Sequence, residues 1–255
     1  MQPRLTDLKA ERRAVRRLLQ ENEPMDAMAA YYAFHHPDDK TTLVLSPKGV
    51  ESAGEARADG YVALSRTGID LFRPLVTMRL PTDRDRAAVE AAADLLGRAV
   101  APGQPVILSI PVRYRPLIDA LFDVQSEERL RLLALEPARY EPIVNVLVRR
   151  SDSQSGLPRF SISSSLSGQE EVVATASLNW QSPRFGEIAV NTRPQHRRQG
   201  WGRSVVAALS GYLIDSGRRP LYVVSVENDA SAGLAESIGF TDTGVQEFLL
   251  QAILK

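Results

Sequence analysis

The sequence contains no cysteine, which excludes disulfide bonds, thiolate nucleophiles and cysteine-ligated zinc. It also lacks an excess of charge, since 31 Lys+Arg balance 31 Asp+Glu, whereas proteins that bind nucleic acids or membrane surfaces usually carry a basic excess. No apolar run approaches the roughly 18 residues of a membrane span. The N-terminal segment lacks the uninterrupted apolar stretch of a signal peptide. We therefore expect no nucleic-acid partner, no membrane segment and a cytoplasmic location.

What is present is typical of a globular protein. The chain has 255 residues, of which 44% are hydrophobic and 24% charged, enough for one large or two small domains. The polar stretch Ser151–Pro158, rich in Ser, Gly and Pro, indicates either a domain boundary or a hairpin loop. We expect an N-terminal α/β half over residues 1–150 and a second domain over residues 151–255.

Hydrophobic periodicity predicts the order strand–helix–strand–helix–strand twice along the chain. The first set comprises residues 71–80, 83–100, 105–110, 114–121 and 129–135, and the second 185–192, 201–216, 221–226, 230–238 and 245–254. Further strands are predicted over residues 41–46, 61–66, 143–150, 160–166 and 172–180. The fold class is therefore α/β (α+β) with a mixed sheet. The repeated order favours a duplicated unit, although any α/β protein can produce such a string.

Residues 190–203 combine a strand end, an arginine-rich turn and the start of a long helix. The first turn of a helix presents unpaired N–H groups and a partial positive charge. Gly200 and Gly202 lack a Cβ, so an anion can approach the main chain closely. Fixed positive charge comes from Arg193, Arg197, Arg198 and Arg203, and no acid lies within the segment. The pattern predicts a diphosphate cradle; the alternative is a tight surface turn with a solvated basic face.

The pattern Arg197-x-x-Gly200-x-Gly202 resembles the acetyl-CoA signature of the GNAT superfamily of N-acetyltransferases. Downstream, the strand Leu221–Val226, the motif Asn228-x-x-Ser231-x-x-Leu234 and Gly239-Phe240 are similar to the family's next strand, loop, helix and turn. The resemblance covers roughly residues 158–254. It implies a GNAT-type acyl-CoA N-acyltransferase fold with two GNAT-like halves packed together, and direct transfer of an acetyl group from acetyl-CoA to an amine without a metal.

The resemblance also implies a set of cofactor-binding residues. In the family, the pantetheine arm lies between two splayed strands and pairs with the first strand, and the diphosphate lies on the helix N-terminus. The corresponding positions are Val190, Asn191, Thr192, Arg197, Arg198, Gln199, Gly200, Trp201, Gly202, Arg203, Ser204 and Asn228. Asn228 can equally be read as a helix N-cap.

The catalytic groups are less clearly indicated. Glu187 is the best candidate base, because family bases often lie on this strand. Alternation puts it on the face opposite Ile188, Val190 and Thr192, an orientation that a bulge would invert. The alternative is a half-exposed strand carboxylate. Ala235 stands where many members carry a tyrosine acid. The alternative function is therefore a non-catalytic acyl-CoA-binding or sensor protein. His196 is expected to face solvent or lie near phosphate.

The first half has no counterpart of the cradle. Residues 81–86 contain two aspartates and no glycine pair, so this half is expected to have lost CoA binding and to wall the acceptor pocket. His35 and His36 are adjacent, do not share a face, and predict a helix end rather than a metal site. Exposed strand edges would permit a homodimer.

Overall fold

The computed structural model describes residues 7–50, 56–81, 86–143, 145–153, 156–164 and 170–255. These residues form two compact units: unit 1 comprises Met1–Arg129 and Gln246–Lys255, and unit 2 comprises Leu130–Val245. The boundary predicted near residue 150 differs from this division. Residues 130–150 belong to unit 2, and the last ten residues return to unit 1, because two long strands each run from one unit into the other.

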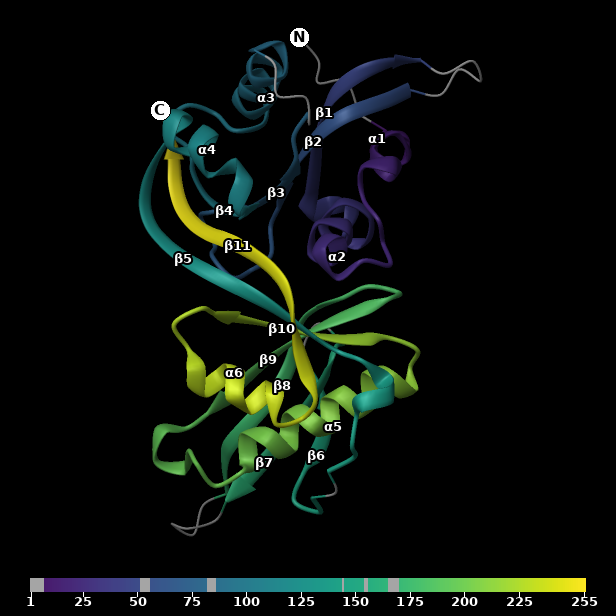
Figure 1. Ribbon diagram of the computed structural model, residues 1–255, viewed down its shortest axis with the longest axis vertical. Coiled ribbons are helices and arrows are strands. Elements are labelled where there is room, and N and C mark those ends of the chain that lie inside the picture. The colour runs from purple at the N-terminus through teal and green to yellow at the C-terminus, as the bar shows by residue number, and fades with distance from the viewer. Residues whose placement is uncertain (1–6, 51–55, 82–85, 144, 154–155, 165–169) are drawn as a thin grey trace. The chain divides into compact units, whose positions relative to one another are not determined.

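Unit 1 has a mixed sheet in the order β1-β2-β3-β4-β11 (Figure 1). Its elements are α1 (Leu8–Val15), α2 (Ala27–Ala30), β1 (Thr41–Val50), β2 (Ala56–Ser65), β3 (Leu75–Arg79), α3 (Arg86–Ala99), β4 (Pro105–Pro111), α4 (Arg115–Leu121), the first part of β5 (Phe122–Leu135) and the last part of β11 (Phe240–Leu254). One apolar cluster lies between α3 and strands β3 and β4, and a second lies between α1, α2 and strands β1 and β2.

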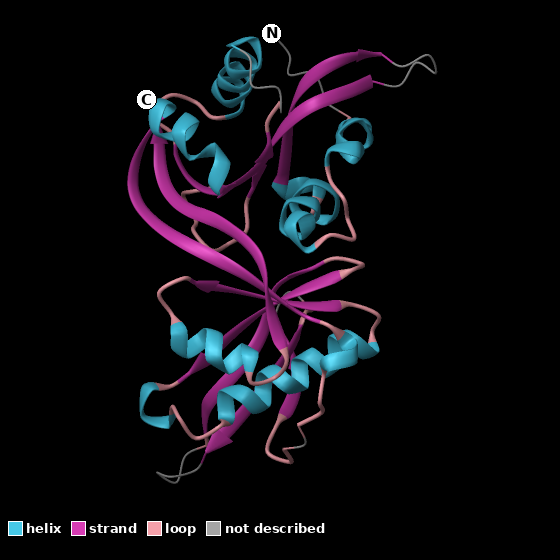
Figure 2. Ribbon diagram, viewed as in Figure 1, coloured by secondary structure: helices cyan, strands magenta, loops and turns pink. Residues whose placement is uncertain are grey.

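Unit 2 has its sheet in the order β5-β10-β9-β8-β7-β6, with the first part of β11 beside β5. Its further elements are β6 (Arg149–Asp152), β7 (Pro158–Ser164), β8 (Glu171–Gln181), β9 (Phe185–Thr192), α5 (Trp201–Asp215), β10 (Arg219–Ser225) and α6 (Asp229–Glu236). Figure 2 shows α5 and α6 in cyan beside the magenta strands of this unit. Both helices contribute to one apolar core with β5 and β7–β10, and α5 fits there because its buried residues follow helical spacing.

The predicted repeat of element order is present in the structure. In unit 1, β3 pairs in parallel with β4, and β4 pairs antiparallel with β11. In unit 2, β9 pairs in parallel with β10, and β10 pairs antiparallel with β5. The strand beside β4 thus comes from the end of the chain and the strand beside β10 from its middle, so neither sheet is built from one half of the sequence.

Two predicted strands are shorter than expected. Of residues 71–80, only 75–79 form β3, because the Asp70 carboxylate accepts hydrogen bonds from the N–H groups of Phe72 (2.7 Å) and Arg73 (3.0 Å) and holds a turn. Of residues 143–150, only 149 and 150 are in β6, because Asn145 forms a similar turn with the N–H of Leu147 (3.0 Å). Asp83 and Asp85, invoked against CoA binding in the first half, lie outside the described residues.

None of the helices in the described part of the chain is long and apolar enough to cross a membrane.

Candidate functional site

The site in unit 2 begins where two parallel strands part. β9 and β10 are paired only at Phe185↔Arg219, Gly186↔Pro220 and Glu187↔Leu221. Beyond these positions β9 continues to Thr192 and β10 to Ser225 without pairing to each other. The main-chain groups of Val190 to Thr192 that face β10 therefore have no ladder partner on that side, as the GNAT resemblance implies for the strand that receives a pantetheine arm.

The N-terminus of α5 lies at the end of β9. Gly200 is the N-cap residue, and no side chain of the described residues caps the helix. The first helical hydrogen bond is Ser204 N to Gly200 O (3.0 Å), so the N–H groups of residues 201–203 precede the ladder. The helix start therefore offers three unpaired donors and the positive end of the helix dipole.

A pocket of about 590 Å³ lies at this point, which is within the usual range for small-molecule sites. Ten of the twelve cofactor-binding residues inferred from the sequence line it: Val190, Asn191, Thr192, Arg197, Arg198, Gly200, Trp201, Gly202, Arg203 and Asn228. The other two do not. Gln199 is exposed outside the pocket, and Ser204 is buried in the core, where its hydroxyl donates to Gly200 O (3.2 Å) and accepts from Asn145 Nδ2 (3.0 Å).

The structure requires glycine at each of the two motif positions for a different reason. Gly200 has φ +77°, a left-handed conformation that favours glycine, and an added Cβ would meet nothing within 4 Å. At Gly202 an added Cβ would lie 2.9 Å from Thr192 Oγ1 and 3.0 Å from Leu234 Cδ1. Gly200 therefore opens the pocket, whereas Gly202 allows α5 to approach β9 and α6 closely.

Positive charge in the pocket comes from three arginines rather than the four expected. Arg193 points away from it: its guanidinium pairs with Glu171 and donates to Val172 O (2.9 Å). Arg197 donates to Thr192 O (3.2 Å) and Arg203 to Ser237 O (3.0 Å), so both are fixed by main-chain carbonyls that leave their charge unneutralised. Arg198 has φ +60°, a strained conformation for a residue with a Cβ.

The far wall of the pocket comes from the loop after β10 and from α6. Asn228 is a helix cap, with its Oδ1 accepting from Ser231 N (3.0 Å), and it also lines the pocket. The cap reading is confirmed, and a contact with a CoA arm stays a prediction. Ala230, Ser231, Leu234 and Ser237 are lining residues that sequence reasoning did not assign to binding. The spacing of Ser231 and Leu234, three residues apart on one helix face, was the available signal.

Ser231 connects the pocket to a buried tyrosine. The Tyr222 hydroxyl lies 2.8 Å from Ser231 Oγ, and burial raises the pKa of Tyr222 above its ordinary value. The phenol therefore stays protonated at neutral pH.

His196 does not face solvent, which was one of the two positions expected for it; the other, near a phosphate, stays a prediction. The residue is buried, its ring stacks on Trp201 with centroids 5.2 Å apart, and it lines the pocket. Its Nδ1 is buried without a hydrogen-bond partner among the described residues. The stacked pair forms a flat wall beside the N-terminus of α5.

Glu187 is not the half-exposed carboxylate that strand alternation predicted. It retains 7% exposure, and its two oxygens accept hydrogen bonds from Asn179 Nδ2 (2.7 Å) and Trp180 Nε1. The pairing of β8 with β9 shifts between Leu178 and Trp180, so Asn179 is an extra residue there, and the bulge turns the Trp180 indole to the face of Glu187. Glu187 also belongs to the last pair before β9 and β10 separate.

Ala235, His35 and His36 have contacts within the fold. Ala235 is completely buried in the core of unit 2. His35 contacts Glu21, and His36 Nδ1 lies 2.8 Å from Thr41 Oγ1. In the part of the chain that the structure describes, no His, Asp and Glu residues gather into a group that could hold a metal ion.

Comparison with known proteins gives a family model that matches part of the chain, and a fold. Residues 169–249 match the family model described as FR47-like protein. No curated protein matches the sequence. Among solved structures, a GCN5-related N-acetyltransferase from Kribbella flavida is similar at 17% identity and a TM-score of 0.58, with 88% of this chain and 95% of that one covered.

Two further structures match almost the whole chain. A tandem GNAT protein from the clavulanic acid biosynthesis pathway has 10% identity and a TM-score of 0.58, covering 97% of this chain and 94% of its own. A Drosophila protein has 13% identity and a TM-score of 0.63, covering 95% and 86%. At these identities the structures show the fold alone: the chain has the GNAT fold that the sequence resemblance implied. The segment that matches the FR47-like model contains the pocket described above.

Proposed function

We propose that the protein transfers an acetyl group from acetyl-CoA to an amine. The observation that carries this proposal is the pocket beside the end of β9, past the point where β9 and β10 part, which opens onto an uncapped helix N-terminus beside three arginines. A ligand that fits has a flexible polar arm followed by a diphosphate. Acetyl-CoA has both, and its thioester supplies the activated acetyl group.

The residues present fit such a ligand. The open space above Gly200 admits an anion, and the donors of residues 201–203 and the arginines supply charge without a nearby acid among the lining residues. The unpaired edge of β9 supplies main-chain groups for the amides of the arm. In this proposal the chain holds the thioester beside the amine, and positioning provides much of the rate enhancement.

The proposed role of Glu187 is to accept a proton from the incoming ammonium, through water. Its place at the parting of the strands and its fixed orientation support this role. Glu187→Gln should lower kcat by about 100-fold and remove the acidic limb of the pH–rate profile, with little change in the KM for acetyl-CoA. Trp180→Phe is the matched control, because it removes the indole hydrogen bond but keeps the carboxylate and should preserve the shape of the profile.

The activity itself is tested by thiol release. Purified protein is incubated with acetyl-CoA and a panel of primary amines, including polyamines, amino acids, aminoglycosides and peptides with free N-termini. Amine-dependent release of CoA thiol, with an acetylated product found by mass spectrometry, supports the proposal. Tight acetyl-CoA binding without turnover on any amine supports the alternative below.

The alternative is an acyl-CoA-binding protein without turnover. Two observations favour it: the tyrosine position is a buried alanine, and the carboxylate of Glu187 is already engaged by two donors. The pair Tyr222–Ser231 is the proposed substitute acid in the enzymatic case. Tyr222→Phe should therefore slow turnover without weakening acetyl-CoA binding.

A further inference from the structure

One buried side chain in the pocket of unit 2 has no role in the function proposed above. His196 ends the short turn Pro194–His196, where its main-chain N–H donates to Arg193 O (2.9 Å). Its ring stacks on Trp201, the first residue of α5, with 17° between the ring planes. The main-chain N–H of Trp201 is one of the three donors that precede the helical ladder. The imidazole therefore lies beside the place proposed for the diphosphate.

The two ring nitrogens of His196 have different surroundings. Nδ1 is buried and has no hydrogen-bond partner among the described residues. The tautomer of a neutral imidazole follows the hydrogen bonds that its nitrogens make, and a buried N–H without an acceptor is the rarer kind of unsatisfied group. We therefore expect the proton on Nε2. Because His196 is only 9% exposed and lines the pocket, Nε2 is the nitrogen that can meet a ligand there.

The pocket lining indicates what an Nε2–H donor would bind. Three arginines line the pocket, and no Asp or Glu is among the lining residues that the structure describes. The free N–H groups at the start of α5 and the helix dipole favour an anion at the same point. A phosphate oxygen is an anionic acceptor, and hydrogen bonds to charged acceptors are the strong ones.

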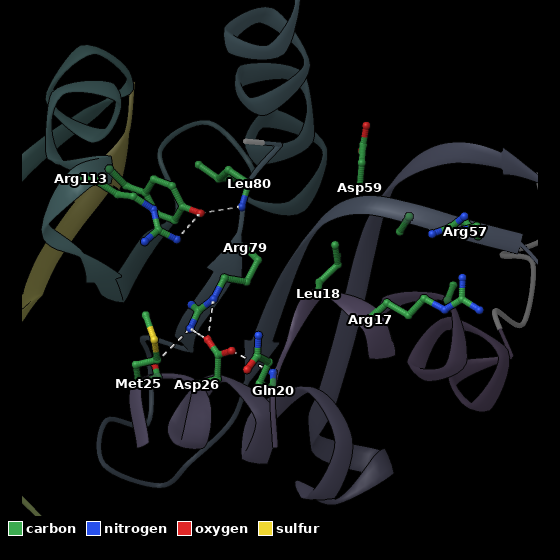
Figure 3. A pocket seen from close by; sticks show the side chains of 13 residues that line it. Arg17, Leu18, Gln20, Met25, Asp26, Arg57, Asp59, Arg79, Leu80 and Arg113 are labelled. Carbon is green, nitrogen blue, oxygen red and sulfur yellow. Dashed lines mark hydrogen bonds and ion pairs between the residues drawn. The ribbon is translucent and has the colours of Figure 1, made fainter. Parts of the chain in front are cut away.

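The pocket of unit 1, of about 390 Å³, has the opposite chemistry. The carboxylates of Asp26 and Asp59 are in its lining, and Asp26 Oδ1 lies 2.5 Å from Arg79 Nη2 (Figure 3). Carboxylates in the lining repel a phosphate. Of these two pockets, the one in unit 2 is therefore the one suited to a phosphorylated ligand.

We propose that His196 donates a hydrogen bond from Nε2 to the diphosphate of acetyl-CoA, and that stacking on Trp201 holds the imidazole in place for this bond. The proposal rests on the acetyl-CoA pocket of the proposed function but does not require acetyl transfer. It makes His196 a specificity residue for the acyl donor, because the bond favours ligands with a diphosphate over pantetheine thioesters without one.

Two variants of His196 separate the donor from the ring in calorimetric titrations of the full chain at pH 8. His196→Phe keeps an aromatic ring beside Trp201 but has no donor, whereas His196→Gln has an amide N–H but no ring. His196→Phe should weaken CoA by about 10- to 100-fold, and His196→Gln should stay within about threefold of the wild type. Dephospho-CoA, which keeps the diphosphate and lacks the 3′-phosphate, should show the same loss in His196→Phe.

Controls verify that the effect is local. His35 belongs to unit 1 and is not in the pocket lining, so His35→Phe and His35→Gln should leave the affinity for CoA unchanged. Melting temperatures verify that each variant is folded.

The tautomer is measured on the wild-type protein by NMR. The chain has three histidines, so the imidazole signals that disappear in His196→Phe, or that remain in both His35→Gln and His36→Gln, belong to His196. Long-range ¹⁵N–¹H correlations at pH 8 should show the Nε2–H tautomer in the ligand-free protein. The Nε2 signal should shift on addition of CoA and stay in place with about 10 mM pantetheine.

Any of five results would overturn the proposal: an Nδ1–H tautomer in the ligand-free protein, an affinity within threefold of the wild type in folded His196→Phe, an equal loss in folded His196→Gln, a loss in His196→Phe that disappears with dephospho-CoA, or the same Nε2 shift with pantetheine. The fourth result would place the contact on the 3′-phosphate and the fifth on the pantetheine arm.

The outcome for this contact is distinguishable from that for the proposed function. Amine-dependent turnover with unchanged affinity in His196→Phe would refute the contact and leave acetyl transfer standing. CoA binding that depends on His196, without turnover on any amine, would do the reverse. A wild-type protein that does not bind CoA would refute both.

Discussion

Gly200→Glu is the sharpest test of the acetyl-CoA pocket. The added carboxylate would stand at the N-cap of α5, among the donors proposed to hold the diphosphate. No atom within 4 Å obstructs the new Cβ, so the substitution fills the pocket entrance without a clash. Its effect on binding is therefore electrostatic and local, which makes its magnitude calculable.

The expected loss of affinity follows from Coulomb's law. A carboxylate about 4–6 Å from a diphosphate repels each charge by roughly 1 kcal/mol in water and by several kcal/mol at lower dielectric. A net penalty of about 2–3 kcal/mol corresponds to a roughly 30- to 150-fold rise in the Kd for acetyl-CoA. The left-handed conformation at φ +77° adds a stability cost of about 1–2 kcal/mol for a residue with a Cβ.

Gly217→Glu is the matched control. Gly217 follows the other end of α5, has φ +73° and likewise has nothing within 4 Å of an added Cβ. It therefore brings the same backbone strain and the same charge, with an added dipole penalty at the helix C-terminus of about 0.3–1 kcal/mol. Both variants should melt a few degrees lower than the wild type, at about 2–4 °C per kcal/mol, and only Gly200→Glu should lose affinity.

Calorimetric titration with acetyl-CoA, and with CoA itself, measures the outcome. Equal affinities for Gly200→Glu and the wild type would refute the assignment of the diphosphate site. Equal losses in both glycine variants would show that strain in α5, and not charge at its N-terminus, governs binding.

Three further predictions concern stability. A fragment of residues 151–255 should fail to fold, because β10 would lose its pairing with β5 and the core would lose the buried side chains of Leu133 and Leu135, each of which contributes about 2–5 kcal/mol. Circular dichroism should show that a fragment of residues 130–245 is more ordered. A cooperative melt of the 151–255 fragment would contradict this prediction. Burial raises the pKa of Glu247, so the folded state binds its proton more tightly than the unfolded state, and the free energy of unfolding falls as pH rises from the unfolded pKa through the folded one. In urea titrations, Glu247→Gln should therefore be more stable than the wild type at pH 8 and lose that advantage at pH 4. A stability difference that does not change with pH would refute this prediction. Ala235→Tyr should destabilise by at least about 1–3 kcal/mol, because the site is fully buried and overpacked cores distort; an unchanged melting temperature would mean that the core has room for the family tyrosine.

Local patterns determined the part of the site that depends on neighbours in sequence. The helix start, the glycine with positive φ and the arginines lie within 14 consecutive residues, 190–203, and the loop at Asn228 follows its strand directly, so ten of the fifteen residues that line the pocket could be read from the sequence. Which arginine faces the ligand could not be read. Arg193 is turned away by Glu171, which lies on the neighbouring strand β8.

Side-chain environment was decided by contacts across strands. Alternation predicted a half-exposed carboxylate for Glu187, but a bulge in β8 brings Trp180 and Asn179 onto it. No pattern within β9 contains that information, because a bulge is defined by the pairing of two strands. The same holds for Asp59 in unit 1, whose unpaired position follows from the register of β2 against β1.

The sequence by itself determined the order of the elements, their repetition and the chemistry of the anion-binding turn, because helix periodicity, glycine conformation and charge act over a few neighbouring residues. Only the tertiary structure decided that β10 is completed by β5 and β4 by β11, so that the two units do not coincide with the two halves of the chain. The physical reason is that an antiparallel strand pair is defined by hydrogen bonds and side-chain packing between residues far apart in sequence, and strands of similar composition compete for the same edge until the whole sheet forms.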